Sequence, residues 1–183
     1  MSKLLAVTCV LLSATLVSTQ LRAADMPADV AALVAKLKDA DPKIRQKAAA
    51  DLGRMGEKAK GALPALIELQ NDKTTWVMTK SLMAIKEIGA DDNAAKAIKP
   101  QLAKFPDIRS LAVDIYVSMG EKAVPHLIEA LKDETTAEGA CEAILQLGPK
   151  GKAASAALTE VSTKHKSKPV RDLAAKALRA VSK

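Results

Sequence analysis

The chain has 183 residues, 49% of them hydrophobic and only 2% aromatic, and a formal net charge of +7 at pH 7. This length allows one domain with a sizeable core. The scarcity of aromatic side chains argues against a reader of single-stranded nucleic acid, which stacks bases on such side chains. The positive charge is uneven, because residues 150–183 carry +7 whereas residues 24–149 sum to −2. Any attraction to a polyanion therefore belongs to the last segment.

Residues 1–23 have the pattern of a secretory signal peptide. Lys3 supplies a positive charge at the start, an apolar run covers residues 4–17, and Ala23 is followed by a second alanine, so small residues stand where cleavage can occur. The apolar run is shorter than the roughly 20 residues that span a bilayer. We expect cleavage near Ala23 and an exported protein, periplasmic or secreted, with an uncleaved N-terminal anchor as the alternative.

The remaining chain repeats one sequence pattern. The phrase MGEKAKGALPALIEL at residues 55–69 returns as MGEKAVPHLIEAL at residues 119–131. Such a recurrence is typical of stacked structural repeats. Glycines close successive copies at intervals of 33, 31 and 31 residues: Gly56, Gly89, Gly120 and Gly151. Eleven residues before each glycine lies an anchor position, which recurs in a fifth, terminal copy; the anchors are Arg45, Met78, Arg109, Ala140 and Arg171.

Residues three, four and seven positions after each anchor predict one apolar face of a helix. The pattern is small, then small or branched, then large. Two helices can therefore approach closely at the small positions and interlock at the large one. The face residues are Ala48, Ala49 and Leu52; Ser81, Leu82 and Ile85; Ala112, Val113 and Tyr116; Ala143, Ile144 and Leu147; and Ala174, Ala175 and Leu178.

A first helix precedes each of these second helices. Prolines are expected near its start, where a first turn tolerates a missing N–H; they are Pro64, Pro100 and Pro125. Aspartates in the link between the two helices can cap the second helix; they are Asp41, Asp72 and Asp133. Glycines can end helices in a left-handed conformation; they are Gly53, Gly56, Gly89, Gly120 and Gly148.

We therefore predict an all-α fold, a right-handed α-solenoid of about five helix–turn–helix repeats over residues 25–183. Each unit alone exposes an apolar face, and stacking buries that face against the neighbouring units. No stretch alternates with the period of a strand, and no linker or second domain interrupts the pattern. The repeats are expected at approximately residues 25–56, 57–89, 90–120, 121–151 and 152–183.

These sequences resemble HEAT repeats. The resemblance is carried by LPALIEL and VPHLIEAL in the first helices, and by DPKIRQKAAADLG and FPDIRSLAVDIYVSMG in the second. The units are shorter than the about 40–47 residues of longer HEAT and armadillo repeats, and are closer to the compact HEAT-like units of many bacterial proteins and of the phycobilin-lyase group. The resemblance implies a ladder between units of link aspartates and second-helix arginines. Its matching pairs here are Asp41 with Arg45 and, less closely, Asp107 with Arg109. Met78 and Ala140, which stand in place of arginine, interrupt it.

The sequence shows no grouping of residues for catalysis or metal binding. His126 and His165 have no Cys, Asp or second His at metal-ligand spacing,. Asp91 and Asp92 are expected at a solvated helix start rather than as a pair of catalytic acids. Cys141 is the only cysteine after the leader and is expected to be a small buried residue rather than a reactive thiol. We predict that the protein is not an enzyme and has neither metal nor cofactor.

Surface residues are the remaining candidates for function. Trp76 stands where other copies have Lys43, Asp107 and Glu138. We therefore expect it to be exposed in the first turn of its helix as a contact for another protein. Packing under a neighbouring loop is the alternative. Arg45 and Arg109 are further candidates on the face lined by the second helices.

The basic last unit is a second candidate surface, with Lys164, Lys166, Lys168 and Arg171 as possible anion-binding residues. The alternative is that these residues are the solvated end of the array.

Our main hypothesis is an exported, non-catalytic scaffold that binds another protein through the second-helix face, as a monomer. The first alternative is a module that binds a polyanion, an acidic lipid or a membrane surface through the basic unit, and nucleic acid is not expected as a partner. The second alternative rests on the resemblance alone: an enzyme accessory related to the HEAT-like bilin lyases.

Overall fold

The structure is a computed structural model that describes residues 26–183. The expected signal peptide and its cleavage near Ala23 lie outside the described residues. Within residues 26–183 the chain is helical and contains no strand. None of the helices in this range has both the length and the apolar character needed to cross a membrane.

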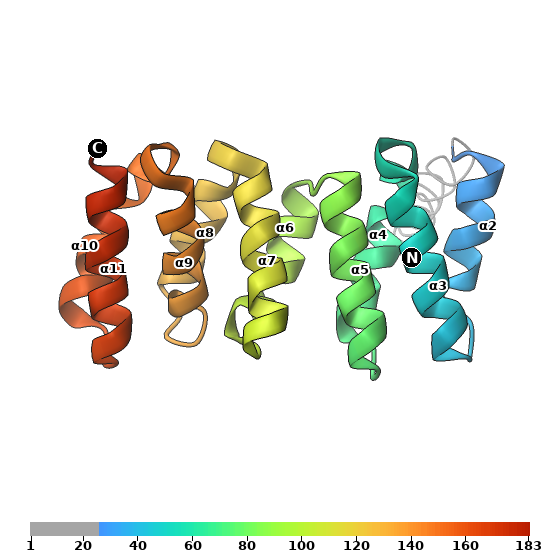
Figure 1. Cartoon of the computed structure of the whole chain (residues 1–183), viewed down its shortest axis with the longest axis horizontal. Coiled ribbons are helices and arrows are strands. Elements are labelled where there is room, and N and C mark those ends of the chain that lie inside the picture. Colours follow the sequence, from blue (N-terminus) through green and yellow to red (C-terminus); the bar gives the residue numbers. More distant parts are fainter. Residues whose placement is uncertain (1–25) are drawn as a thin grey trace, which may run out of the picture.

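The helices form two rows, with the second helix of each pair in one row and the first helix in the other (Figure 1). The second helices are α3 (Pro42–Arg54), α5 (Thr75–Ile88), α7 (Pro106–Met119), α9 (Ala137–Leu147) and α11 (Lys168–Val181). The first helices are α2 (Ala28–Lys36), α4 (Leu63–Glu68), α6 (Asp92–Ile98), α8 (Val124–Leu131) and α10 (Ser155–Lys164). Short 3-10 segments extend them: η1 (Gly56–Ala62), η2 (Leu69–Asn71), η3 (Lys99–Ala103), η4 (Gly120–Ala123) and η5 (Gly148–Ala154). The described residues thus form an α-solenoid of helix pairs, which confirms the predicted fold.

Glycines end four of the second helices. The prediction is confirmed for four of the five glycines that it named and is wrong for one. Positive φ angles occur at Gly56, Gly89, Gly120 and Gly148, where a side chain would be strained. The prediction for Gly53 is wrong, because this glycine is buried inside α3. A Cβ atom at Gly53 would lie 3.0 Å from the Cα atom of Ala84 in α5. Gly53 is therefore required for the close packing of two neighbouring units and not for a turn.

The prolines follow the prediction in two units and depart from it in the third. Pro64 and Pro125 lie in the first turns of α4 and α8. Pro100 instead follows α6 and lies in η3, so its predicted place near the helix start is wrong. In this unit Asp91 caps α6, accepting a hydrogen bond of 2.8 Å from the backbone N–H of Ala94. In this unit the α-helix therefore comes first and the 3-10 segment η3 follows it, whereas α4, α8 and α10 each follow a 3-10 segment.

The predicted apolar faces form the core of the solenoid. All the face residues of the first four units are buried, including Ser81. In the fifth unit Ala174 is buried, whereas Ala175 and Leu178 are only half-buried. This difference follows from stacking, because among the described residues no unit lies beyond α11 to cover them.

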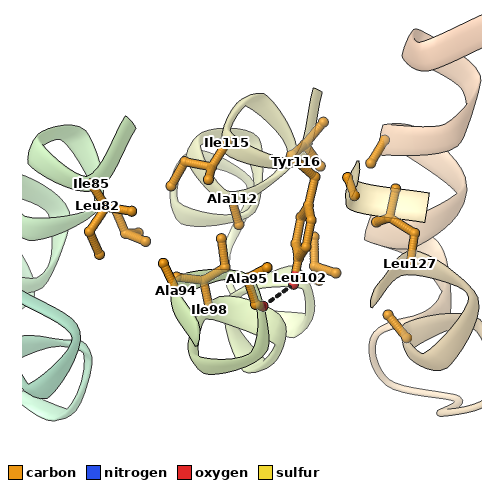
Figure 2. Close-up of a cluster of buried hydrophobic side chains, with 14 of the residues drawn as sticks. Leu82, Ile85, Ala94, Ala95, Ile98, Leu102, Ala112, Ile115, Tyr116 and Leu127 are labelled. Atoms are coloured by element: carbon orange, nitrogen blue, oxygen red, sulfur yellow. Dashed lines mark hydrogen bonds between the residues drawn. The ribbon is translucent and has the colours of Figure 1, made fainter. Parts of the chain in front are cut away.

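Tyr116 shows how one unit packs internally and against the next. Its ring lies among side chains of α6, η3, α7 and α8 (Figure 2). Its hydroxyl donates a hydrogen bond of 2.6 Å to the backbone carbonyl of Ala95. Burial raises the pKa of the Tyr116 hydroxyl well above its usual value, so this group remains a neutral donor inside the core.

Candidate protein-interaction surface

Arg45, a candidate contact, is held within the fold. Its Nε and Nη2 atoms donate to Asp72 Oδ2 and Oδ1 of the next unit at 2.8 and 3.0 Å. Its Nη1 atom donates to the backbone carbonyls of Asp39 and Ala40 at 2.8 and 3.0 Å. The side chains of Arg45 and Asp72 are only 16% and 7% exposed. The structure therefore gives Arg45 a role in joining the first two units.

The arginine ladder uses other partners than the resemblance implies. Asp41 does not pair with Arg45 but caps α3, accepting a hydrogen bond of 2.8 Å from the N–H of Lys43. The Asp41 side chain is already bonded to its own helix, whereas Asp72 lies in the link between the two helices of the next unit and contacts Arg45 from there. The hydrogen bonds from Arg45 are the main cause that lowers the pKa of the Asp72 carboxyl.

Arg109, the other candidate arginine, also spans a junction between units. Its Nη1 atom lies 3.0 Å from Glu138 Oε2, and its Nε atom lies 3.4 Å from Glu142 Oε2. Both glutamates belong to α9 of the next unit, so the predicted pairing with Asp107 is wrong. The Arg109 side chain is mostly buried between the two helices, which limits its access to a partner protein.

The two junctions without an anchor arginine have ion pairs of another kind. Lys86 of α5 lies 2.7 Å from Asp114 of α7. Lys166, which precedes α11, lies 2.9 Å from Glu134, which precedes α9. These pairs are more exposed than that of Arg45 and contribute less to stability. Each junction between described units therefore has a charged contact, although the ladder itself is interrupted at Met78 and Ala140.

The basic residues of the last unit are paired with neighbours on the surface. Lys164 lies 3.1 Å from Glu160, and Lys168 lies 2.7 Å from Asp172. Lys166 makes the contact with Glu134 described above. Arg171 donates from Nη1 to the carbonyls of His165 and Lys166 at 2.6 and 2.9 Å. The structure brings all four candidate cations to one end of the solenoid, but each of them already has a polar partner there.

Trp76 is exposed, as its position in the repeat predicts, with 69% of its surface accessible. It lies in the first turn of α5. The other exposed large hydrophobic residues of the described chain are Ile44, at 39%, and Phe105, at 79%. Ile44 lies in the first turn of α3, and Phe105 is the residue that precedes α7. These three residues lie at the N-terminal ends of three consecutive second helices (Figure 1). We call this surface the aromatic edge after Trp76 and Phe105, with the aliphatic Ile44 beside them.

Phe105 is the contact candidate that sequence reasoning missed. It occupies the N-cap position of α7, where the other second helices have Asp41, Thr74, Thr136 and Ser167. Polar residues are strongly preferred at an N-cap. An aromatic residue in a repeat position that otherwise holds only Asp, Thr and Ser is the signal that could have identified it.

The histidines and Cys141 are the remaining groups that the sequence analysis considered. His126 Nε2 lies 3.3 Å from Asp92 Oδ1 at the side of a groove of about 890 Å³ that crosses the middle units. Residues 26–183 contain no cluster of three or more His, Cys, Asp or Glu side chains suited to a metal. Cys141 is fully buried, as predicted, and burial, followed by the charges of Glu142 and Glu138, raises its pKa to about 12. A buried, protonated thiol of this kind is typical of a structural cysteine.

A family model and two engineered proteins of known structure agree with this architecture. A family model described as HEAT repeats matches residues 30–112. An engineered protein from a structural genomics consortium is similar in structure, with a TM-score of 0.54 and 19% sequence identity over 85% of this chain and 80% of that protein. A second engineered protein from the same consortium has a TM-score of 0.53 and 18% identity over 85% of this chain and 48% of that protein. A designed armadillo repeat protein matches at 18% identity over 81% of this chain and 98% of the design, with a TM-score of only 0.32.

No curated protein sequence matches the chain. The identities to the engineered proteins are low, so the likeness concerns the fold alone. Over residues 30–112 the chain is similar to HEAT repeats, and its fold is an α-solenoid of HEAT-like helix pairs.

Proposed function

We propose that this protein is a non-catalytic scaffold that binds another protein through the aromatic edge of its second-helix row. A solenoid of stacked helix pairs presents an extended surface of the kind that serves for protein binding. The observation that carries the proposal is the exposure of Trp76 and Phe105 on neighbouring helices. Tryptophan and other aromatic side chains are enriched among residues that dominate protein–protein affinity.

Local stability does not explain either aromatic residue. Phe105 at an N-cap cannot accept a hydrogen bond from the helix, whereas Asp41 does so at the equivalent position of α3. Trp76 stands where the first, third and fourth units have a charged residue in the first turn of the second helix. Both side chains expose apolar area to water without contributing to the core, and a partner that covers them would recover that area.

The charges beside the aromatic edge indicate the chemistry of the partner. Lys73 and Lys104 are exposed, and neither forms an ion pair with another described residue. Lys73 lies three residues before Trp76, and Lys104 directly precedes Phe105. A partner surface with an apolar centre and carboxylates at its rim would match this arrangement.

We expect Phe105→Asp and Trp76→Ala each to weaken partner capture by at least about tenfold, because both remove a central apolar contact. Phe105→Asp should leave the melting temperature unchanged or slightly higher, because aspartate can cap α7 as Asp41 caps α3. The measurement is crosslinking with mass spectrometry in the native compartment, followed by titration of the identified partner.

The matched control is Lys43→Ala, which changes the position equivalent to Trp76 in the first unit and should leave capture unchanged. Full capture by both aromatic variants would rule out the aromatic edge as the contact surface.

Export is part of the same proposal. It is supported by the charged start, apolar run and alanines of residues 1–23,. The intact mass of the protein recovered outside the cytoplasm should correspond to a chain that begins directly after Ala23, and a full-length chain retained in the cytoplasm would exclude it.

A further inference from the structure

Arg171 of the last unit has the same backbone contacts as Arg45 of the first. In each case Nη1 donates to the carbonyls of the residues six and five positions earlier. These contacts are 2.8 and 3.0 Å for Arg45, and 2.6 and 2.9 Å for Arg171. In each of these two units, a pair of backbone carbonyls therefore holds the guanidinium group near the N-terminus of the second helix.

The two arginines differ in their remaining donors. Arg45 uses Nε and Nη2 for a bidentate contact with Asp72 of the following unit. Arg171 belongs to the last helix pair of residues 26–183, and its Nε and Nη2 atoms have no partner among these residues. A guanidinium fixed in this way is preorganised for a planar carboxylate.

Asp39 of the first unit has the same local geometry as Asp72. Asp72 lies six residues before its anchor, and its Oδ1 atom accepts a hydrogen bond of 2.8 Å from the N–H of Thr74. Asp39 also lies six residues before its anchor, and its Oδ1 atom accepts 2.9 Å from the N–H of Asp41. Asp39 makes no side-chain ion pair with a described residue, because no helix pair in the described range precedes it.

The two halves of this contact lie at opposite ends of the solenoid (Figure 1), with α2 and α3 at one end and α10 and α11 at the other. At the α11 end, Leu178 is half-buried, although the equivalent Leu52 and Ile85 are fully covered by a following unit. At the other end, the exposed residues of α2 include small ones that would allow another helix to approach closely: Ala28, Ala31, Ala32 and Ala35.

We infer that copies of this protein associate head to tail, with Arg171 of one copy binding Asp39 of the next. The contact would reproduce the Arg45–Asp72 contact between the first two units and would cover Leu178 with α2 of the second copy. Because the two surfaces differ, the association is heterologous and can continue into an open chain. This arrangement differs from the monomer that the sequence suggests, and it does not depend on the aromatic edge.

The test is sedimentation equilibrium of the protein expressed from its full sequence, over a wide range of concentrations. The average mass of the wild type should rise with concentration beyond that of a dimer. Arg171→Gln and Asp39→Asn should each remain monomeric, and an equal mixture of the two should form a dimer and nothing larger. In that mixture one variant retains Asp39 and the other retains Arg171, so a single contact can form.

Lys176→Gln is the matched control, since it removes one positive charge from an exposed position of the same helix and should associate like the wild type. Asp39→Asn keeps an oxygen that can accept from Asp41, so its helix content and melting temperature should be preserved. A wild type that stays monomeric at every concentration would overturn the inference. So would an Arg171→Gln variant that associates normally, or a mixture that remains monomeric while the wild type associates through some other contact.

Discussion

Replacement of Gly139 by valine should lower the free energy of unfolding by about 3 kcal/mol. Gly139 lies in the first turn of α9, against the backbone of η3. A Cβ atom at this position would lie 2.7 Å from the carbonyl oxygen of Leu102 and 3.1 Å from its Cα atom. Backbone atoms cannot rotate away as a side chain can, so α9 must separate from the preceding unit.

The loss should appear in urea unfolding followed by circular dichroism at 222 nm, as a lower midpoint with native helix content retained in water. Gly61→Ala is the control for loss of a glycine as such. A Cβ atom there would meet only the flexible side chain of Met26, at 3.3 Å or more. A Gly139→Val variant as stable as the wild type would show that α9 and η3 do not pack as closely as described.

The second large effect is expected for Asp72→Asn, which should lower the melting temperature at pH 7 by about 5 °C. Asparagine keeps an oxygen that can accept from Thr74 but removes the charge that binds the Arg45 fork. Arg45 would then remain mostly buried without its carboxylate, which is more costly than the absence of the whole pair.

The effect of Asp72→Asn should depend on pH in a defined direction. The pKa of Asp72 is lowered in the folded chain, first by its hydrogen bonds from Arg45. A group of this kind contributes its full stabilisation above the pKa of the unfolded chain, and this contribution is lost as the pH falls through the folded pKa. The difference in stability between wild type and variant should therefore be constant above about pH 5 and should shrink below about pH 4.

Melting curves of wild type and Asp72→Asn from neutral to acidic pH measure this difference. Lys86→Gln provides a comparison, since the pair of Lys86 with Asp114 is exposed and should contribute little,. A difference that persists unchanged at pH 3 would mean that the Asp72 charge does not stabilise the folded state.

The sequence was sufficient to predict the helix pairs and their core, because both depend on residue spacing. The residues three, four and seven positions after each anchor define the buried face of each second helix. This spacing does not depend on which residues the neighbouring units contain. The exposure of Trp76 followed from the same register, and the burial of Cys141 followed from the ordinary behaviour of a lone cysteine as a small apolar residue,.

The contacts between units could not be predicted in this way. Arg45 pairs with Asp72 rather than Asp41, and this choice depends on how far one unit is shifted against the next. The role of Gly53 depends on the position of Ala84 in another helix. Pro100 was misplaced because a capping aspartate starts α6 early, and this changes the order of α-helix and 3-10 segment within one unit.

The measurement that tests stacking most directly is circular dichroism of a peptide covering residues 90–120, which contains α6, η3 and α7. We expect it to be mostly unstructured in water and to show no cooperative thermal transition. Its helices are short, and the side chains of Leu102, Ile115 and Tyr116 would lose the cover of the neighbouring units,. A peptide with the helix content that these residues have in the whole chain, and with a cooperative transition, would show that a single pair folds alone and that the repeats are not held by their neighbours.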